Sequence, residues 1–130
     1  MSSITPQSNG LATLVARVFL SILFILAGFS KLTAISGTAV GFEKMGLPVP
    51  VITAGLVGLV EFVGGLAILV GFQTRIAAVI VALFTIGATL VAHVSPFDQT
   101  SVLKNLAIAG GLILLALQGA GSISIDAKRG

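Results

Sequence analysis

Four apolar runs, each close to twenty residues long, constrain what this chain can fold into. The runs cover residues 11–29, 51–72, 75–94 and 102–119. A helix of about 20 residues crosses a hydrocarbon core about 30 Å thick, so each run predicts a membrane-spanning helix. The runs show no alternation of polar and apolar residues, which disfavours a membrane β-barrel. The sequence therefore predicts an all-α, membrane-embedded four-helix bundle, formed by a single domain over residues 1–130.

Composition supports lipid as the solvent of this chain. Residues of the hydrophobic class make up 56% of the sequence and charged residues only 8%, whereas about 25% of a soluble domain is charged. A soluble protein of 130 residues could not hide so much apolar surface, because a large share of a small chain stays outside. The net charge of +3 comes from few acidic residues and not from a basic patch, so no nucleic-acid partner is expected.

The connection between the first two runs is long enough to hold further structure. Residues 38–45 predict a short helix lying at the membrane interface, which the sequence Gly46-Leu47-Pro48-Val49-Pro50 ends. Four spans place both termini on one side of the membrane, here called the terminal side; the opposite side is the distal side. Basic residues are shared equally between the sides. If Lys104 lies within the membrane, the terminal side carries the excess and faces the cytoplasm of a bacterial inner membrane.

Glu61 lies in the middle of the second run, with no other charged residue within ten positions. A carboxylate at the centre of a bilayer is costly unless it is paired or neutral. Counted from the centres of their runs, Arg17 lies within about 5 Å of the depth of Glu61. The sequence therefore predicts an intramembrane Arg17–Glu61 ion pair. A purely structural role for this pair, fixing helix register, is the alternative.

Helical spacing places small or polar residues on one face of each run, and these faces are predicted to point inward. The faces are Arg17, Ser21, Phe24, Gly28 and Lys31 in the first run; Ala54, Gly58, Glu61 and Gly65 in the second; Ala78, Ala82, Thr85, Thr89 and His93 in the third; and Lys104, Ile108, Gly111 and Gln118 in the fourth, with Asn105 adjacent.

Several of these polar residues fall toward the distal side, which predicts a pocket open to that side with Glu61 at its floor. The predicted ligand-binding residues are Arg17, Lys31, Glu61, His93, Lys104 and Asn105. No catalytic residue and no metal site is predicted. In the competing interpretation, Lys31 and Lys104 reach the lipid headgroups and His93 is an interface residue that binds nothing.

The chain lacks the side chains that carry electrons. It has no cysteine, which excludes thiolate chemistry and iron–sulfur clusters within this chain, and its single histidine excludes bis-histidine haem ligation within one chain. We therefore expect no intrinsic cofactor and no self-contained catalytic machinery.

Ordered sequence blocks give the chain a family resemblance. The blocks are Arg17 with Ala27-Gly28-Phe29-Ser30-Lys31, the Gly46–Pro50 sequence, Glu61-Phe62-Val63-Gly64-Gly65 through Gly71-Phe72-Gln73-Thr74-Arg75, Lys104-Asn105-Leu106-Ala107 with Gly110-Gly111, and residues 119–126. Together they resemble the DoxX family of small four-span membrane proteins. The resemblance implies that Arg17, Glu61, Lys104 and Asn105 form the polar core. For function, the resemblance implies either a membrane subunit of a quinone-linked sulfur oxidoreductase or a partner of a soluble redox enzyme.

Two hypotheses for function follow. In the first, the bundle is the membrane subunit of a redox complex and holds a quinone, whose carbonyl oxygens accept hydrogen bonds from Lys104, Asn105 and His93. In the second, it is a non-catalytic lipid-binding or scaffold protein. The expected partners are membrane lipid, a soluble or membrane-bound oxidoreductase and a second copy of the chain. A transporter is disfavoured because the sequence shows no internal repeat.

Overall fold

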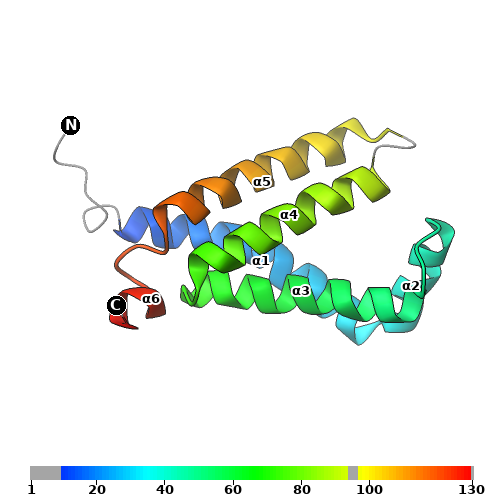
Figure 1. The fold of residues 1–130 in the computed structure, drawn as a ribbon, viewed down its shortest axis with the longest axis horizontal. Helices are drawn as coiled ribbons and strands as arrows, with labels where there is room; N and C mark the ends of the chain where they lie inside the picture. The colour runs from blue at the N-terminus through cyan, green and yellow to red at the C-terminus, as the bar shows by residue number, and fades with distance from the viewer. Residues whose placement is uncertain (1–9, 94–96, 130) are drawn as a thin grey trace.

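The computed structural model describes residues 10–93 and 97–129, and it confirms the all-α membrane bundle (Figure 1). Four helices are long and apolar enough to cross a membrane. They are α1 (Gly10–Thr33), α3 (Pro50–Val70), α4 (Thr74–Ala92) and α5 (Gln99–Gln118). The short helix α2 (Ile35–Lys44) is the predicted interfacial helix between the first two spans, and a second short helix, α6 (Ile125–Arg129), was not predicted.

The predicted span limits agree with the helices to within a few residues. The largest difference is at the end of α1, which continues to Thr33 and places Lys31 inside its last turn. The helix α5 begins three residues earlier than the apolar run, because Asp98 caps it: the carboxylate accepts hydrogen bonds from the backbone N–H of Ser101 at 3.2 Å and from its hydroxyl at 2.7 Å. These bonds hold the pKa of Asp98 below its ordinary value. Val94, the predicted last residue of the third span, lies outside the described residues.

The four spans form two antiparallel pairs, α1 with α3 and α4 with α5. Figure 1 shows the pairs meeting at the end where α6 lies and diverging toward the end where α2 lies. The tight turn between α3 and α4 joins the two pairs on the terminal side. The hydrophobic core, formed by residues such as Phe24, Ile68, Val81 and Leu112, lies nearer the terminal side than Glu61 does.

Three of the four predicted inward faces are confirmed. The buried residues include Arg17, Ser21, Phe24 and Gly28 in α1, all four predicted positions in α3, and Ala78, Ala82, Thr85 and Thr89 in α4. The predicted face of α5 is confirmed only in part, since Ile108 packs against the core and lines a cavity at the distal side. Lys104 and Gln118 are exposed, whereas Ala109, Leu112 and Leu115 are buried. This helix packs mainly against α4 rather than around a central axis, so its large aliphatic residues form the contact.

Glycine allows α1 and α3 to pack closely. A Cβ atom on Gly28 would lie 2.4 Å from the backbone nitrogen of Phe62 and 2.7 Å from the carbonyl oxygen of Gly58. A Cβ on Gly65 would similarly meet Ile25 at 2.8 Å. Because backbone atoms cannot move aside as side chains can, Gly28 fixes the axial register of the two helices, as small residues commonly do in membranes.

Candidate functional site

The buried acid of the bundle is paired with a lysine. The Nζ atom of Lys31 in α1 lies 2.8 Å from Oε1 of Glu61 in α3. Glu61 is 8% exposed, and the Lys31 side chain is 26% exposed. The glycine contact described above places the last turns of α1 beside the middle of α3. The pair therefore neutralises a carboxylate that would otherwise be costly inside a membrane.

The predicted Arg17–Glu61 pair is wrong, and the reason is the register of α1 against α3. Because Gly28 contacts Phe62, the residue of α1 opposite Glu61 lies near position 29. Arg17 is about twelve residues away along the helix axis, or about 18 Å at 1.5 Å per residue. The two spans are not aligned at their centres, as the sequence prediction assumed. They are offset along their axes, so that the start of α1 packs against the C-terminal segment instead.

Arg17 is buried at the terminal side, where it holds the C-terminal segment. It is 1% exposed, and its guanidinium Nη2 donates a hydrogen bond to the carbonyl oxygen of Ile123. A Cβ on Gly71 would overlap Nη1 of Arg17, and Gly71 also has a φ of +73°, which favours glycine. Arg17 is therefore a structural residue at the opposite end of the bundle from Lys31.

The other five predicted site residues lie around one cavity of about 600 Å³ between the two helix pairs. Lys31 and Glu61 come from the α1/α3 pair, and His93, Lys104 and Asn105 come from the α4/α5 pair and its connection. The remaining lining is largely apolar and includes Leu23, Phe24, Val57, Phe84 and Ile108. The cavity thus combines an apolar wall with polar groups on two sides. Ligand binding by these residues stays a prediction.

Asn105 is held by the hydroxyl group of Thr89 on α4. Its Nδ2 donates to Oγ1 of Thr89 at 2.9 Å, and the same hydroxyl donates to the Thr85 carbonyl at 2.7 Å. The Thr85 hydroxyl in turn donates to the Val81 carbonyl at 2.8 Å. This arrangement fixes the amide plane. Within the described part of the chain no hydrogen bond is made to Oδ1 of Asn105, which leaves this oxygen as an acceptor.

Lys104 is the most open member of the set. It is exposed, yet it also lines the cavity together with His93. No described residue forms an ion pair or hydrogen bond with its ammonium group. Lys104 can therefore place a positive charge at the open edge of the cavity.

The sequence prediction missed the contribution of α2 and the residues after it. Phe42, Met45, Leu47 and Thr53 also line the cavity. The Thr53 hydroxyl donates to the Pro48 carbonyl at 2.6 Å and ties this connection to the first turn of α3. The apolar residues of the expected interfacial helix were the available signal, since a surface helix must turn them toward either lipid or protein.

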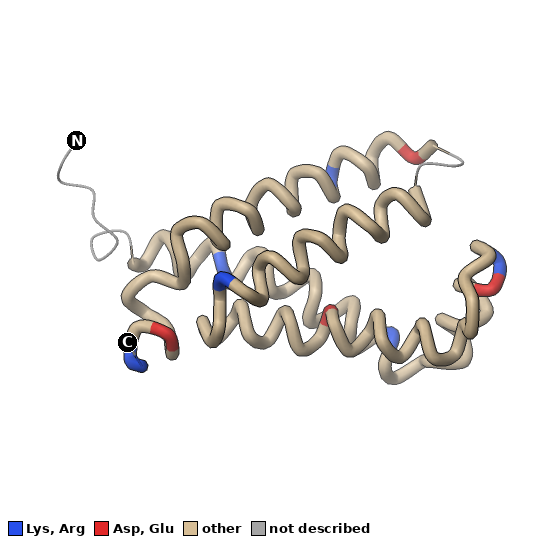
Figure 2. The backbone as a smooth tube through the Cα atoms, in the orientation of Figure 1, with Lys and Arg blue, Asp and Glu red and all other residues tan. Residues whose placement is uncertain are grey.

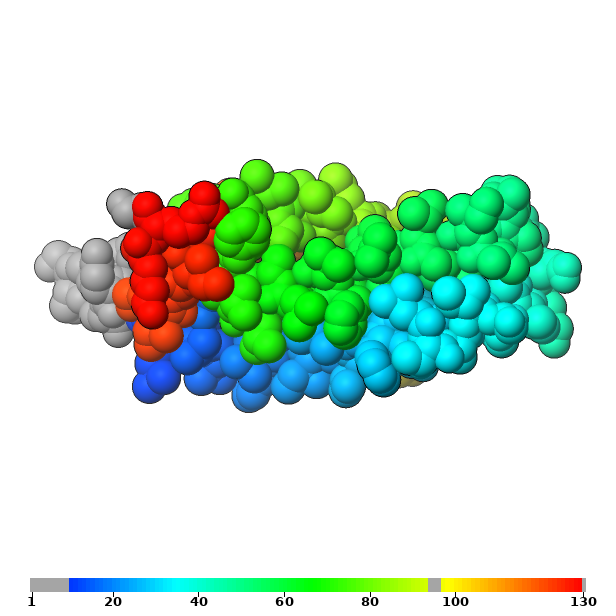
Figure 3. All heavy atoms as spheres, turned by 90° about the horizontal axis from the view of Figure 1, so that it is seen from below, coloured from blue at the N-terminus to red at the C-terminus, as the bar shows by residue number. Residues whose placement is uncertain are grey.

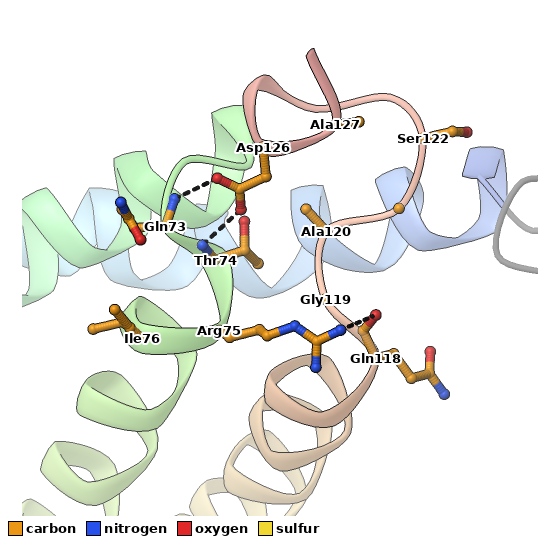
Figure 4. Close-up of a pocket in the computed structure, with 11 residues that line it drawn as sticks. Gln73, Thr74, Arg75, Ile76, Gln118, Gly119, Ala120, Ser122, Asp126 and Ala127 are labelled. Carbon is orange, nitrogen blue, oxygen red and sulfur yellow. Dashed lines mark hydrogen bonds between the residues drawn. The ribbon is translucent and has the colours of Figure 1, made fainter. Parts of the chain in front are cut away.

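The terminal side contains a second set of interactions that the sequence did not reveal. The Asp126 carboxylate accepts hydrogen bonds from the backbone N–H groups of Gln73 at 2.7 Å and Thr74 at 2.9 Å, and thereby caps α4 (Figure 4). Burial would raise the pKa of Asp126, but these bonds and the nearby Arg129 outweigh it and lower the pKa. Arg75 caps α5 by donating to the carbonyl oxygens of Leu117 at 2.6 Å and Gln118 at 3.3 Å.

A family model and several individual proteins match this chain. The family model described as DoxX matches residues 12–94. The inner membrane protein YqjF of Escherichia coli is 46% identical, with 87% of this chain and 88% of that protein aligned. The inner membrane protein YphA of Escherichia coli is 32% identical, with 88% of each chain aligned.

A third relative carries a functional name. The Bacillus subtilis protein named "Putative oxidoreductase CatD" is 32% identical over 92% of this chain and 88% of its own length. No solved structure matches the chain with significance. The relatives therefore agree with an integral membrane protein of the bacterial inner membrane and give a hint of redox association.

Proposed function

Because the chain belongs to the DoxX family, we propose that it is an inner-membrane subunit of a redox complex and that its cavity binds an apolar molecule with a polar head. The observation that carries this proposal is the placement of Lys31, Glu61, His93, Lys104 and Asn105 around one largely apolar cavity. Ligand sites are commonly apolar with a few polar groups that fix orientation. The name of the Bacillus relative supports the redox association.

A quinone fits this proposed cavity chemically. A bound quinone would supply the two-electron chemistry that the chain lacks, since the sequence has no cysteine and a single histidine. The residues of the chain would bind and orient it. Lys104 and His93 can donate hydrogen bonds to a carbonyl oxygen, and the apolar wall can hold the isoprenoid tail. Electrons would come from, or go to, an oxidoreductase partner docked on the bundle.

The second candidate is a non-catalytic lipid-binding or scaffold protein. The exposed ammonium group of Lys104 at the cavity mouth favours it, because a cation at the edge of an apolar cavity also suits an anionic lipid headgroup. In both candidates the polar head of the ligand lies near Lys104 and its apolar tail lies along the apolar wall of the cavity. They differ in the identity of the occupant and in the presence of an oxidoreductase partner.

Identification of the co-purified small molecule tests the proposal. The protein would be purified in mild detergent and its organic extract analysed by mass spectrometry, for the wild type and for a Lys104→Leu, Asn105→Leu double variant. We expect a quinone in the wild-type extract and at least a fivefold loss in the variant. The matched control is Gln99→Leu with Thr100→Leu, two exposed polar residues in the first turn of the same helix that do not line the cavity.

The outcomes separate the candidates. A phospholipid that depends on Lys104 and Asn105, with no quinone, would replace the redox proposal with the lipid-binding one. Equal retention in all three proteins would show that Lys104 and Asn105 do not hold the extracted molecule and would contradict the proposed site. A tagged chain that captures an oxidoreductase after cross-linking in cells would support the subunit role independently of the extract.

A further inference from the structure

A second cavity, of about 640 Å³, lies at the terminal side of the bundle (Figure 4). It is bounded by the first turn of α4, the connection after α5 and the short helix α6. The polar residues at its boundary include Gln73, Arg75, Gln118 and Ser122. It is distinct from the cavity of the proposed function, because the two share no lining residue.

The terminal side carries an excess of positive charge. The terminal half holds four basic residues, Arg17, Arg75, Lys128 and Arg129, and one acidic residue, Asp126. The distal half holds three residues of each sign, including the Lys31–Glu61 pair. The whole net charge of +3 therefore lies at the terminal side. Figure 2 shows these charged positions gathered around α6 and the adjacent helix ends.

Arg75 brings its charge to the cavity without an ion pair to any described residue. Its hydrogen-bond partners are the carbonyl oxygens of Ala116, Leu117 and Gln118, which are neutral. The carboxylate of Asp126 also faces the cavity, but both of its oxygens accept hydrogen bonds from the start of α4. The guanidinium of Arg75 is exposed and can still receive an anion on its open face, because a guanidinium carries five N–H donors.

The depth of the cavity indicates the source of that anion. It lies where the span α4 begins and the span α5 ends, which is the level of the lipid headgroups. Exposed apolar side chains, Ile76 and Leu117, continue from it along the spans. A headgroup at Arg75 would therefore have its acyl chains beside these residues.

We propose that this terminal cavity binds the phosphate of an anionic phospholipid, with Arg75 as the residue that contacts the phosphate. An anion here offsets the excess positive charge of the terminal half. The same phosphate chemistry occurs in soluble phosphate, so the test must separate the two sources.

Native mass spectrometry of the full chain in detergent, titrated with phosphatidylglycerol or phosphatidylcholine, tests this site. We expect the wild type to retain one phosphatidylglycerol at least fivefold better than phosphatidylcholine. Arg75→Gln should remove this preference, whereas Arg75→Lys should keep most of it. The matched control is Lys44→Gln, which removes one positive charge from the distal side and should change nothing.

A further variant covers the case in which loss of the Arg75 cap unfolds the protein. Ser122→Asp places a negative charge at the exposed edge of the cavity and leaves Arg75 and its hydrogen bonds in place, while Ser122→Asn is its neutral control. We expect only the aspartate to abolish the preference. Equal binding of phosphatidylglycerol by wild type, Arg75→Gln and Ser122→Asp would overturn the proposal. Displacement of the lipid by millimolar inorganic phosphate would overturn the lipid assignment and indicate a soluble anion.

Discussion

The two ends of this bundle are built differently. At the terminal end, the C-terminal segment packs across the ends of the spans (Figure 3), and Arg17, Arg75 and Asp126 bind backbone groups of other segments. At the distal end the helix pairs separate around a largely apolar cavity whose charged lining residues are Lys31, Glu61 and Lys104. The terminal end is therefore fixed by side chains that bind the backbone of other segments, although it carries a surface cavity of its own, whereas the helix pairs diverge at the distal end (Figure 1). The difference teaches that fixing the helix ends on one side lets the two helix pairs diverge around a cavity between them on the other.

Substitution of Gly28 by alanine should have the largest effect on this arrangement. Its Cβ would lie 2.4 Å from the backbone nitrogen of Phe62, so α1 and α3 must move apart. We expect a loss of about 3 kcal/mol in the free energy of unfolding, the upper part of the range for overpacking. A denaturant titration in detergent micelles measures it.

Gly110→Ala is the matched control, because a Cβ atom added there would meet no atom of another helix within 4 Å and the residue is exposed. It should leave stability unchanged or raise it by about 0.5–1 kcal/mol through helix propensity. Equal stability of Gly28→Ala and Gly110→Ala would mean that α1 and α3 do not pack as closely at the distal end as described.

Loss of Glu61 should weaken the distal end. Glu61→Ala leaves the Lys31 ammonium without its partner, at a cost of about 1–3 kcal/mol. This is less than the figure of about 3–5 kcal/mol for a fully buried pair, because the Lys31 side chain is 26% exposed and can reach the headgroups. Glu61→Gln should cost less than Glu61→Ala, since the amide still accepts a hydrogen bond. Melting curves in detergent would rank the variants.

Glu43→Ala is the control for that comparison, since Glu43 is an exposed acid of α2 next to Lys44. Its effect should stay within the range of exposed ion pairs, below about 1 kcal/mol. If Glu61→Ala and Glu43→Ala melt alike, the Lys31–Glu61 contact does not stabilise the fold.

Removal of the Asp126 cap should weaken the terminal end by a smaller amount. Asp126→Ala leaves the first N–H groups of α4 without an acceptor, and loss of such a cap costs about 1 kcal/mol. Because the folded-state pKa of Asp126 is lowered, its contribution is fully present above the unfolded pKa of about 3.9. It is lost as the pH falls through the lower, folded-state pKa. The difference in stability between wild type and Asp126→Asn should therefore shrink in acid.

A second carboxylate, Asp98, contributes to the same pH series. Asp98 has a lowered pKa as well, so both proteins lose some stability in acid. Only the difference between them reports on Asp126. A difference that stays constant down to the lowest pH would mean that the Asp126 charge does not stabilise the cap.

The smallest expected effect is a difference in mobility between the two ends. Since the chain has no cysteine, pairs of cysteines can be introduced for spin labels without background. Val70→Cys with Leu117→Cys reports on α3 and α5 at the terminal end, and Val51→Cys with Leu103→Cys reports on the same helices at the distal end. We expect a broader distance distribution for the distal pair. Equal widths, measured by pulsed electron paramagnetic resonance, would contradict the expected difference between the fixed terminal end and the diverging distal end.

The sequence alone determined the spans, the interfacial helix and most of the inward faces. Apolar runs of span length predict helices in lipid, because each backbone N–H and C=O group must form its hydrogen bond within the protein. In α3, small residues at helical spacing around Glu61 marked the buried face, and the structure buries all four of them. In α5, which lacks a contrast between small and large residues on opposite faces, the same reasoning found Ile108 but missed the buried Ala109, Leu112 and Leu115.

Only the tertiary structure decided which groups meet. The partner of Glu61 depends on the axial register of α1 and α3, and that register is set by the contact of Gly28 with the backbone of α3. Run midpoints cannot reveal an offset of this kind. The cap on α4 comes from Asp126, 52 residues beyond Thr74, because the adjacent Gln73 has a left-handed backbone and its side chain makes no cap. Sequence patterns report local periodicity and burial, whereas hydrogen bonds between distant segments follow from packing.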